Sequence, residues 1–205
     1  MESVTTMSKK DLYKRLYFFS MFDGYLENTG KNARLKVTML KENADYIDKV
    51  ATTLEEVPLG YTLREPPTAS NHRQTIAIQS KTHPILTTLH QRLYCSGKKA
   101  IEPHMLTLLD AEALAIAFMA DGNRNVDRRQ ENEYVAYRLH TNSFTYGDCE
   151  LFKKAIKEKL FLEFNIEKTG KNGQFNLRLL ASSKERFEEL MTDFVLPSFL
   201  YKLGR

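Results

Sequence analysis

The chain has 205 residues, 42% of them hydrophobic and 27% charged, with a formal net charge of +4 and an isoelectric point near 8.9. This length can bury one large core or two fused small ones. No apolar run approaches the roughly 18 residues that a membrane-spanning helix needs, and the positive charge permits a polyanionic partner without requiring one.

The N-terminal residues 1–10 are polar and contain no apolar stretch typical of a secretion signal. We therefore expect a flexible N-terminus on an intracellular protein. The solitary Cys95 and Cys149 fit a reducing compartment and form neither a CxxC pair nor a zinc set.

The first half of the chain predicts helices and strands in alternation. A buried helix is expected over 11–23 and an amphipathic helix over 42–57, separated by a strand at 34–39. Two strands of a hairpin follow at 60–64 and 73–79, and Pro84 begins a further helix that extends to about residue 94.

The second half repeats this order. Asp110 is the expected N-cap of a helix that ends at Asp121, and Glu112 lies in its first turn. The remaining elements are a strand at 134–141, a helix at 148–160, strands at 162–167 and 174–180 joined by a turn at 170–173, and a helix at 184–194.

Matching spacings indicate a duplication. Thr38 precedes Lys99 by 61 residues (99 − 38), and Thr141 precedes Lys202 by the same 61 (202 − 141). The chain therefore predicts an α+β fold of two pseudo-symmetric αββαββα repeats, at 11–100 and 101–205, each with one curved antiparallel sheet whose apolar face is covered by helices. Matching the two threonines leaves the basic positions of the two strands one residue out of phase, so either one strand carries a bulge or the alignment is off by one.

Both apolar helices are predicted to end in Asp-Gly, at Asp23-Gly24 and Asp121-Gly122, 98 residues apart (121 − 23). Glycine is expected there because it enters the left-handed conformation that ends many helices. A carboxylate is unfavourable at a helix C-terminus by roughly 0.3–1 kcal/mol, because the helix dipole is negative there. Two such residues in matching frames suggest that something cationic lies where these helices end.

The two Asp-ended helices resemble the LAGLIDADG motifs of single-chain homing endonucleases. The likeness is strongest in residues 114–122 (LAIAFMADG), 140–145 (HTNSFT) and 197–203 (PSFLYKL), and covers about residues 11–203. The first motif is more divergent, with Tyr17 and Phe18 where small residues often lie. A Phe-, Met- and Leu-rich helix that ends in Asp-Gly is more commonly an ordinary core helix, so the paired frames and the flanking motifs carry the inference.

The resemblance implies a catalytic centre at a pseudo-two-fold axis between the two motif helices. Asp23 and Asp121 would bind Mg²⁺ or Mn²⁺, which would polarise the scissile phosphate and activate water. Lys99 and Lys202 occupy the positions of the catalytic-pocket lysines, although Lys98 is a competing match for Lys99. Asn142 matches a residue that positions water, whereas Met39 at the corresponding place of the first repeat cannot, so the two strands of a target could be cut at different rates.

The resemblance also implies that the two sheets form saddles that read a long, imperfectly palindromic double-stranded DNA site as a monomer. An outward residue recurs at every second strand position, so alternating basic or amide side chains can line a groove. Arg124 and Arg128 follow the second motif and are candidates for phosphate contacts. The full set of DNA-binding candidates is Arg34, Lys36, Arg64, Arg73, Arg124, Arg128, Arg138, Lys168, Lys171, Gln174 and Arg178.

The sequence is therefore interpreted as that of a metal-dependent, site-specific DNA endonuclease, and the resemblance implies that it leaves short 3′ overhangs. Three alternatives stay open: a maturase that assists splicing of group I intron RNA, a DNA-binding protein of the same fold that has lost catalysis, and a duplicated α/β module with another role. The first predicts firm binding of intron RNA with weak or absent DNA cleavage, and the second predicts specific binding without hydrolysis.

Overall fold

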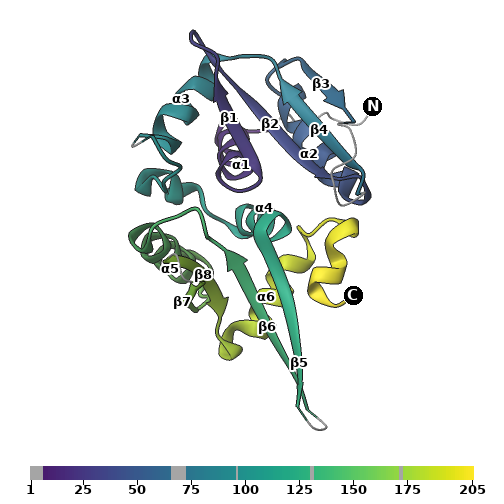
Figure 1. Ribbon diagram of the computed structural model, residues 1–205, viewed down its shortest axis with the longest axis vertical. Coiled ribbons are helices and arrows are strands. Elements are labelled where there is room, and N and C mark those ends of the chain that lie inside the picture. Colours follow the sequence, from purple (N-terminus) through teal and green to yellow (C-terminus); the bar gives the residue numbers. More distant parts are fainter. Residues whose placement is uncertain (1–6, 66–72, 96, 130–131, 171–172) are drawn as a thin grey trace. The chain divides into compact units, whose positions relative to one another are not determined.

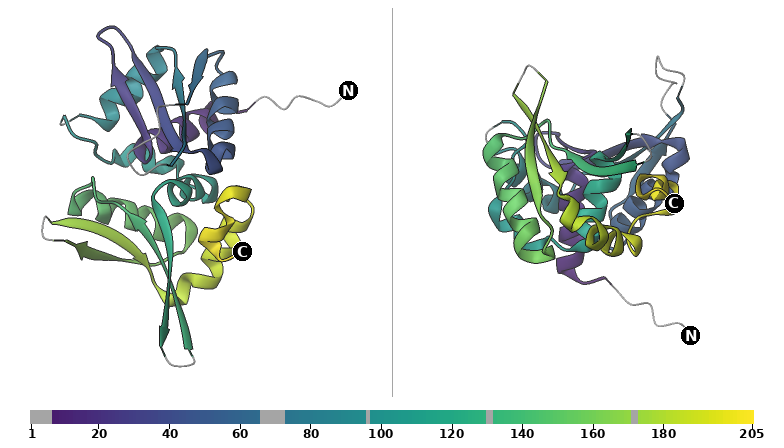
Figure 2. Two further views of the ribbon diagram at one scale, coloured as in Figure 1. Left: turned by 45° about the vertical axis from the view of Figure 1, so that its right-hand side comes forward. Right: turned by 90° about the horizontal axis from the view of Figure 1, so that it is seen from below.

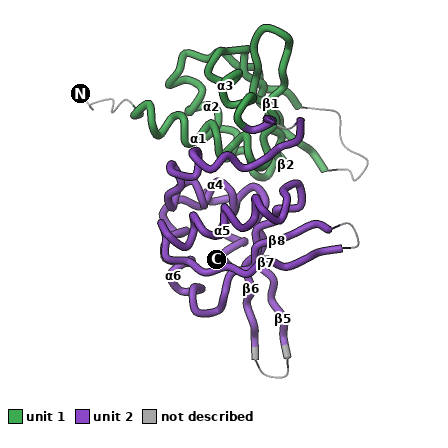
Figure 3. The backbone as a smooth tube through the Cα atoms, turned by 90° about the vertical axis from the view of Figure 1, so that its left-hand side faces the viewer, with its two compact units in different colours: residues 1–92 green, residues 93–205 purple. Residues whose placement is uncertain are grey.

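The computed structural model describes residues 7–65, 73–95, 97–129, 132–170 and 173–205. The chain divides into two compact units, Met1–Arg92 and Leu93–Arg205 (Figure 3). The division lies eight residues before the repeat boundary at residue 100 that the sequence suggests. The expected flexible segment 1–10 lies partly outside the described residues, and its last two residues already belong to the first helix.

Unit 1 contains one four-stranded antiparallel sheet with the strand order β1-β2-β4-β3 (Figure 1). Its elements in chain order are α1 (Lys9–Met21), β1 (Gly24–Asn28), β2 (Ala33–Leu40), the 3₁₀ helix η1 (Lys41–Asn43), α2 (Ala44–Glu55), β3 (Tyr61–Arg64), β4 (Thr75–Ser80) and α3 (Pro84–Leu93).

Unit 2 repeats this arrangement with the strand order β5-β6-β8-β7. Its elements are η2 (Pro103–Leu108), α4 (Ala111–Asp121), β5 (Gly122–Arg129), β6 (Asn132–His140), α5 (Tyr146–Leu160), β7 (Phe164–Thr169), β8 (Gln174–Leu179), η3 (Ala181–Ser183), α6 (Lys184–Thr192) and η4 (Pro197–Leu203).

The predicted fold class of two repeated α+β units with antiparallel sheets is confirmed. The predicted strand ranges left out β1 and β5, the strands that follow the two motif helices and that complete the predicted αββαββα order. In β5 the sequence GNRNVDRR has a single apolar side chain, so no apolar alternation signals a strand. Continuous pairing with β6 holds it in the sheet instead.

Helices pack on one face of each sheet (Figure 2). The helix α2 presents buried Tyr46, Ile47, Val50 and Leu54 on one side, as its amphipathic sequence predicts. The helix α4 is different, because every residue from Ala113 to Met119 is buried. An all-apolar helix of this kind needs cover on all sides.

An aromatic cluster anchors α4 in unit 2. The Phe118 ring lies 5.9 Å from that of Tyr137 on β6 and 5.1 Å from that of Phe187 on α6, both edge-on. Edge-to-face pairs of this kind contribute about 0.5–1.5 kcal/mol beyond their buried area. The C-terminal end of α4 is therefore held firmly against the sheet three residues before Asp121.

Candidate functional site

The two Asp-Gly junctions connect a helix to a strand over at most two residues: α4 passes directly into β5, whereas Phe22 and Asp23 lie between α1 and β1. Gly122 is the C-cap of α4 and the first residue of β5, with an extended backbone at φ −94° and ψ 154°. Neither Gly24 nor Gly122 has a positive φ. The prediction of a left-handed glycine at these helix ends was therefore wrong.

Close backbone approach explains these glycines instead. A Cβ atom at Gly122 would overlap the Phe118 carbonyl oxygen and lie 2.7 Å from Phe118 Cε2. A Cβ at Gly24 would overlap the Phe19 carbonyl oxygen and lie 2.9 Å from its carbonyl carbon. Each strand thus begins directly over the last turn of its helix, which only glycine permits.

The expected cation is present at the end of α4. The Lys202 ammonium, from η4, donates hydrogen bonds to the Met119 carbonyl at 2.6 Å and the Phe118 carbonyl at 3.4 Å. A cation at a helix C-terminus interacts favourably with the dipole and with the carbonyl groups of the last turn, although the Phe118 carbonyl also accepts from the Gly122 amide. Lys202 thereby offsets the unfavourable position of the Asp121 carboxylate.

Asp121 is half-buried, and its burial raises the pKa of its carboxyl group above the usual 3.8. The positive charges of Lys99, His140 and Lys202 act in the opposite direction without cancelling the effect of burial. The Asp121 carboxylate supplies the kind of oxygen ligand that Mg²⁺ or Mn²⁺ takes. Within the ranges of the chain that the structure covers, no cluster of three or more His, Cys, Asp and Glu side chains could hold a metal ion.

The segment that carries Lys99 is fixed by hydrogen bonds within unit 2. The Ala100 amide donates to the Leu93 carbonyl at 2.8 Å, and the Ile101 amide donates to Asp148 Oδ1 at 3.0 Å. The other oxygen of Asp148 caps the start of α5 together with Thr145. One carboxylate thus joins the Lys99 segment to the N-terminus of α5.

His140 is a neighbour of Asp121 that the sequence prediction missed. Strand register gives the reason: Gly24 pairs with Val37 in unit 1, as Gly122 pairs with Leu139 in unit 2. This equivalence superposes Thr38 on His140, one residue away from the alignment that matched the two threonines.

The alignment from sequence was therefore off by one, and β1-β2 and β5-β6 pair without interruption by a bulge. Met39 corresponds to Thr141 and both are buried, so Met39 is not the counterpart of the exposed Asn142. Asn142 follows β6 and accepts a hydrogen bond from Thr169 at 3.4 Å. The difference between the halves lies instead in Thr38 against His140.

Asp23 belongs to unit 1, whereas Asp121, Lys99, Lys202 and Asn142 belong to unit 2. The helix α1 ends at Met21 with Phe22 as its C-cap, and Asp23 is half-buried between Phe22 and β1. Asp23 thus lies two residues beyond the last residue of its helix, whereas Asp121 is itself the last residue of α4.

Register divides the DNA-binding candidates between the two sheet faces, because cross-strand partners point to the same side. The face not covered by helices, called here the open face, carries six of them: Arg34, Lys36, Arg64, Arg138, Gln174 and Arg178. Three lie on the opposite face: Arg124, Arg128 and Lys168. Arg73 lies just before β4, and Lys171 is outside the described residues.

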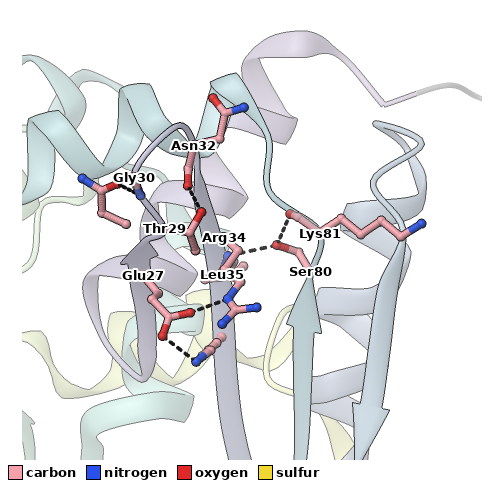
Figure 4. Close-up of polar contacts among 10 residues, drawn as sticks. Glu27, Thr29, Gly30, Asn32, Arg34, Leu35, Ser80 and Lys81 are labelled. Carbon is pink, nitrogen blue, oxygen red and sulfur yellow. Dashed lines mark hydrogen bonds and ion pairs between the residues drawn. The ribbon is translucent and has the colours of Figure 1, made fainter.

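Carboxylates pair with most of these cations. On the open face, Glu27 accepts from Arg34 and from Lys36, the latter at 2.9 Å (Figure 4). The hydrogen bonds from Arg34 and Lys36 hold the pKa of Glu27 below its usual value. The same figure shows Ser80 accepting from the Leu35 amide and donating to the Lys81 carbonyl, which ties β2 to the end of β4.

Arg124 is occupied within unit 2. Its side chain is only 24% exposed and lies 3.4 Å from Glu133, and a Cβ at Gly204 would come within 2.8 Å of its Cζ. Gly204 itself adopts the left-handed conformation at φ 79°. Arg124 therefore lies beneath the C-terminal segment, on the face of the sheet opposite Arg138. Arg128 also faces Glu133 but is 80% exposed.

No helix among the described residues has the length and apolar character needed to cross a bilayer.

Comparisons with known proteins identify the fold. The chain resembles the homing endonuclease I-WcaI bound to its DNA recognition sequence, at a TM-score of 0.78 and 22% identity over 97% of this chain and 88% of that one. It also resembles I-DmoI in complex with DNA and Mn, at a TM-score of 0.56 and 12% identity over 89% of this chain and 97% of that one.

The curated relatives are longer proteins that match part of this chain. A cytochrome b mRNA maturase bI2 of Debaryomyces hansenii is 26% identical over 132 residues, which are 64% of this chain and 47% of that protein. A Protein RecA of Mycolicibacterium flavescens is 28% identical over 58% of this chain and 30% of its own length. The chain thus spans less than half the length of these relatives. A model of the LAGLIDADG DNA endonuclease family matches residues 21–187, most of the sequence, and the chain therefore belongs to this family.

Proposed function

We propose that this protein is a monomeric, site-specific homing endonuclease that makes a metal-dependent double-strand break in a long DNA target. The observation that carries the proposal is the repeated junction in which a carboxylate, at or just beyond the end of the motif helix, precedes a glycine that begins a strand against the last turn of that helix. One carboxylate from each repeat matches one cut in each strand. The DNA-bound state of I-WcaI supports the same partner for this chain.

The metal ligands proposed here are Asp23 of unit 1 and Asp121 of unit 2. Mg²⁺ or Mn²⁺ bound there would polarise the scissile phosphate and lower the pKa of the attacking water. An ammonium has three N–H donors, so Lys202 can hold the α4 carbonyls and still donate to a phosphate oxygen. Lys99 would stabilise negative charge on the phosphate in the same way.

Water positioning would fall to Asn142 and His140. Asn142 is exposed beyond the end of β6, and His140 bears electrostatically on Asp121. Unit 1 has Thr38 at the place of His140 and Leu40 at the place of Asn142, since Val37 corresponds to Leu139. We therefore expect the two strands to be cut at different rates, with a nicked intermediate.

DNA recognition would use the open faces of both sheets. Alternating side chains from neighbouring strands place arginine and glutamine, which pair with guanine and adenine in the major groove, on one surface. Arg73, just before β4, remains a candidate, as does Lys171, which is outside the described residues. Arg124, Arg128 and Lys168 are weaker candidates, because their strand register directs them to the other face.

Incubation with a genomic or randomised duplex DNA library in Mg²⁺, followed by sequencing of the cut ends, tests the proposal. A recurrent cut site with short 3′ overhangs would support it. Binding of one recurrent sequence without cut ends would favour a DNA-binding protein that has lost catalysis.

The maturase is the second candidate, because a curated relative is an mRNA maturase. It predicts tight binding of a group I intron RNA and no recurrent DNA cut. Running the library assay beside an intron-RNA binding assay separates the two activities, which one protein can also combine.

A further inference from the structure

Two arginines lie directly opposite each other on the open face of unit 2. Arg138 on β6 and Arg178 on β8 are register partners. Directly opposed like charges destabilise a sheet. A neighbouring acidic group that relieves this repulsion also decides where the two guanidinium groups point.

Glu167 is that group. It lies on β7, pairs with Asn176 of β8, and therefore occupies the open face one row from the arginine pair. Its Oε2 accepts from Arg138 Nε at 2.9 Å, and its Oε1 accepts from Arg178 Nη1 at 3.1 Å. Burial raises the pKa of Glu167, but the hydrogen bonds from the two arginines outweigh it, so the pKa is lowered and the group stays ionised.

The hydrogen bond to Glu167 uses Nε of Arg138 and not its two terminal Nη groups, which are the atoms that would contact a base. The Arg138 side chain is 23% exposed and that of Arg178 is 49% exposed. A guanidinium group is planar, so a hydrogen bond that fixes Nε also fixes the orientation of the plane that holds the two Nη donors. This geometry suits bidentate recognition of guanine O6 and N7.

We propose that Glu167 is a specificity-determining positioning residue, which holds Arg138 and Arg178 in the orientation that reads bases of a DNA duplex. This inference rests on the proposed function, since it assumes that the open face of unit 2 binds DNA. Both oxygens of Glu167 are engaged by arginine, so it acts through these side chains rather than by accepting from a base. Partly exposed ion pairs contribute little stability, which leaves orientation as the main effect of the contact.

Unit 1 lacks this arrangement. Lys36 faces Gln79 across β2-β4, so no arginine pair lies there. Its acidic residue, Glu27, comes from β1 and binds Arg34 and Lys36, which are neighbours along one strand. The effect of removing the Glu167 charge should therefore be confined to the half of the target that unit 2 contacts.

The test compares the wild type with Glu167→Gln and with Glu150→Gln. Glu150 lies on α5, pairs with Lys153 at 2.8 Å, and its substitution changes the net charge equally on the helical side of the unit. Each protein selects sequences from a randomised duplex library without divalent metal, and its affinity for a scrambled duplex is measured by fluorescence anisotropy. Melting temperatures establish that the variants are folded.

For Glu167→Gln we expect opposite changes in the two readouts. Discrimination at one or two adjacent base pairs of one half-site falls about 10-fold, because the arginines lose their fixed orientation. Affinity for the scrambled duplex rises about threefold, because a negative charge next to the phosphates is gone. Glu150→Gln should retain the wild-type sequence preference.

If Glu167→Gln keeps the wild-type sequence preference, or loses preference evenly over the whole site, the proposed role of Glu167 is overturned. The proposed DNA-reading function is not affected by either result. If the wild type enriches no sequence, the DNA-reading function proposed above fails, and this inference fails with it. The two failures are thus distinguished by the behaviour of the wild type.

Discussion

The Lys202 ammonium lies 2.6 Å from the Met119 carbonyl oxygen, two residues before the candidate metal ligand Asp121. Its side chain also lies beside the Phe199 ring, with Nζ 5.3 Å from the ring centroid. The C-terminal 3₁₀ helix of unit 2 therefore provides the cap of the motif helix. This contact joins the stability of the helix end to the position of the carboxylate.

Replacing Lys202 by methionine should destabilise the protein by about 1–2 kcal/mol, because a charge-assisted hydrogen bond and a favourable dipole interaction are lost. Thermal unfolding should show a melting temperature lower by several degrees. Lys154→Met is the matched control. Lys154 is 71% exposed, and its ion pair with Glu158 is long, at 3.8 Å. Equal melting temperatures for the two variants would mean that the Lys202 contact does not stabilise α4.

Replacing Asp121 by asparagine should abolish double-strand cleavage while DNA binding survives. The same variant should be more stable than the wild type at pH 7 in EDTA. The reason is that burial raises the folded-state pKa of Asp121 above 3.8, so the ionised form is disfavoured by folding.

The sign of the pH dependence follows from that shift. A raised folded-state pKa stabilises the protein below the unfolded value of 3.8, and this contribution is lost as pH rises through the folded pKa. The advantage of Asp121→Asn should therefore appear as pH rises from below 3.8 to neutral. Urea unfolding at several pH values measures it, and an advantage that is constant with pH would contradict the assigned cause.

Replacing Gly122 by alanine should destabilise unit 2 by roughly 1–3 kcal/mol or more, because the new Cβ overlaps the Phe118 backbone and ring. Gly147→Ala is the control. Gly147 lies in the first turn of α5, where a Cβ would come no closer than 3.8 Å to Thr145 Oγ1. The control should be neutral or slightly stabilising, because alanine favours helix. Circular dichroism melts of both variants decide the matter.

Replacing Arg178 by alanine should weaken binding of a mixed-sequence duplex and reduce the salt-dependence slope of binding by about 1, because Arg178 lies on the open face. Lys168→Ala removes the same charge from the opposite face and should leave the slope unchanged. Equal effects of the two variants would show that the face assignment does not govern DNA contact.

Several features of the fold follow from local sequence. Asp110 accepts from the Ala113 amide at 2.9 Å, as a predicted N-cap should, and α2 buries the apolar side that its periodicity defines. The strands β1 and β5 could not be found in this way, because β5 depends on pairing with β6 rather than on its own residues.

The candidate site was only partly accessible to the same reasoning. Asp121 follows from a carboxylate in an unfavourable place at a helix end, whereas Lys202 follows from the resemblance to the family motif and not from its contact with α4. His140 was missed because the alignment of the repeats used the identical threonines, whereas Gly24–Val37 and Gly122–Leu139 pairing gives the true equivalence. Lys168 lies on the helix-covered face of the sheet, as its cross-strand pairing with Phe175 shows. The periodicity of one strand does not specify which residues it pairs with.

The direct passage from α4 into β5 has a consequence for how such a protein can change its length. A single residue inserted between Phe118 and Gly122 would turn the Asp121 side chain about 100° around the helix axis, since each residue advances an α-helix by that angle. No loop exists at this junction to absorb the rotation. Insertions in unit 2 that keep this orientation of the carboxylate must therefore occur elsewhere, at the tips of hairpins or in the segment that joins the units.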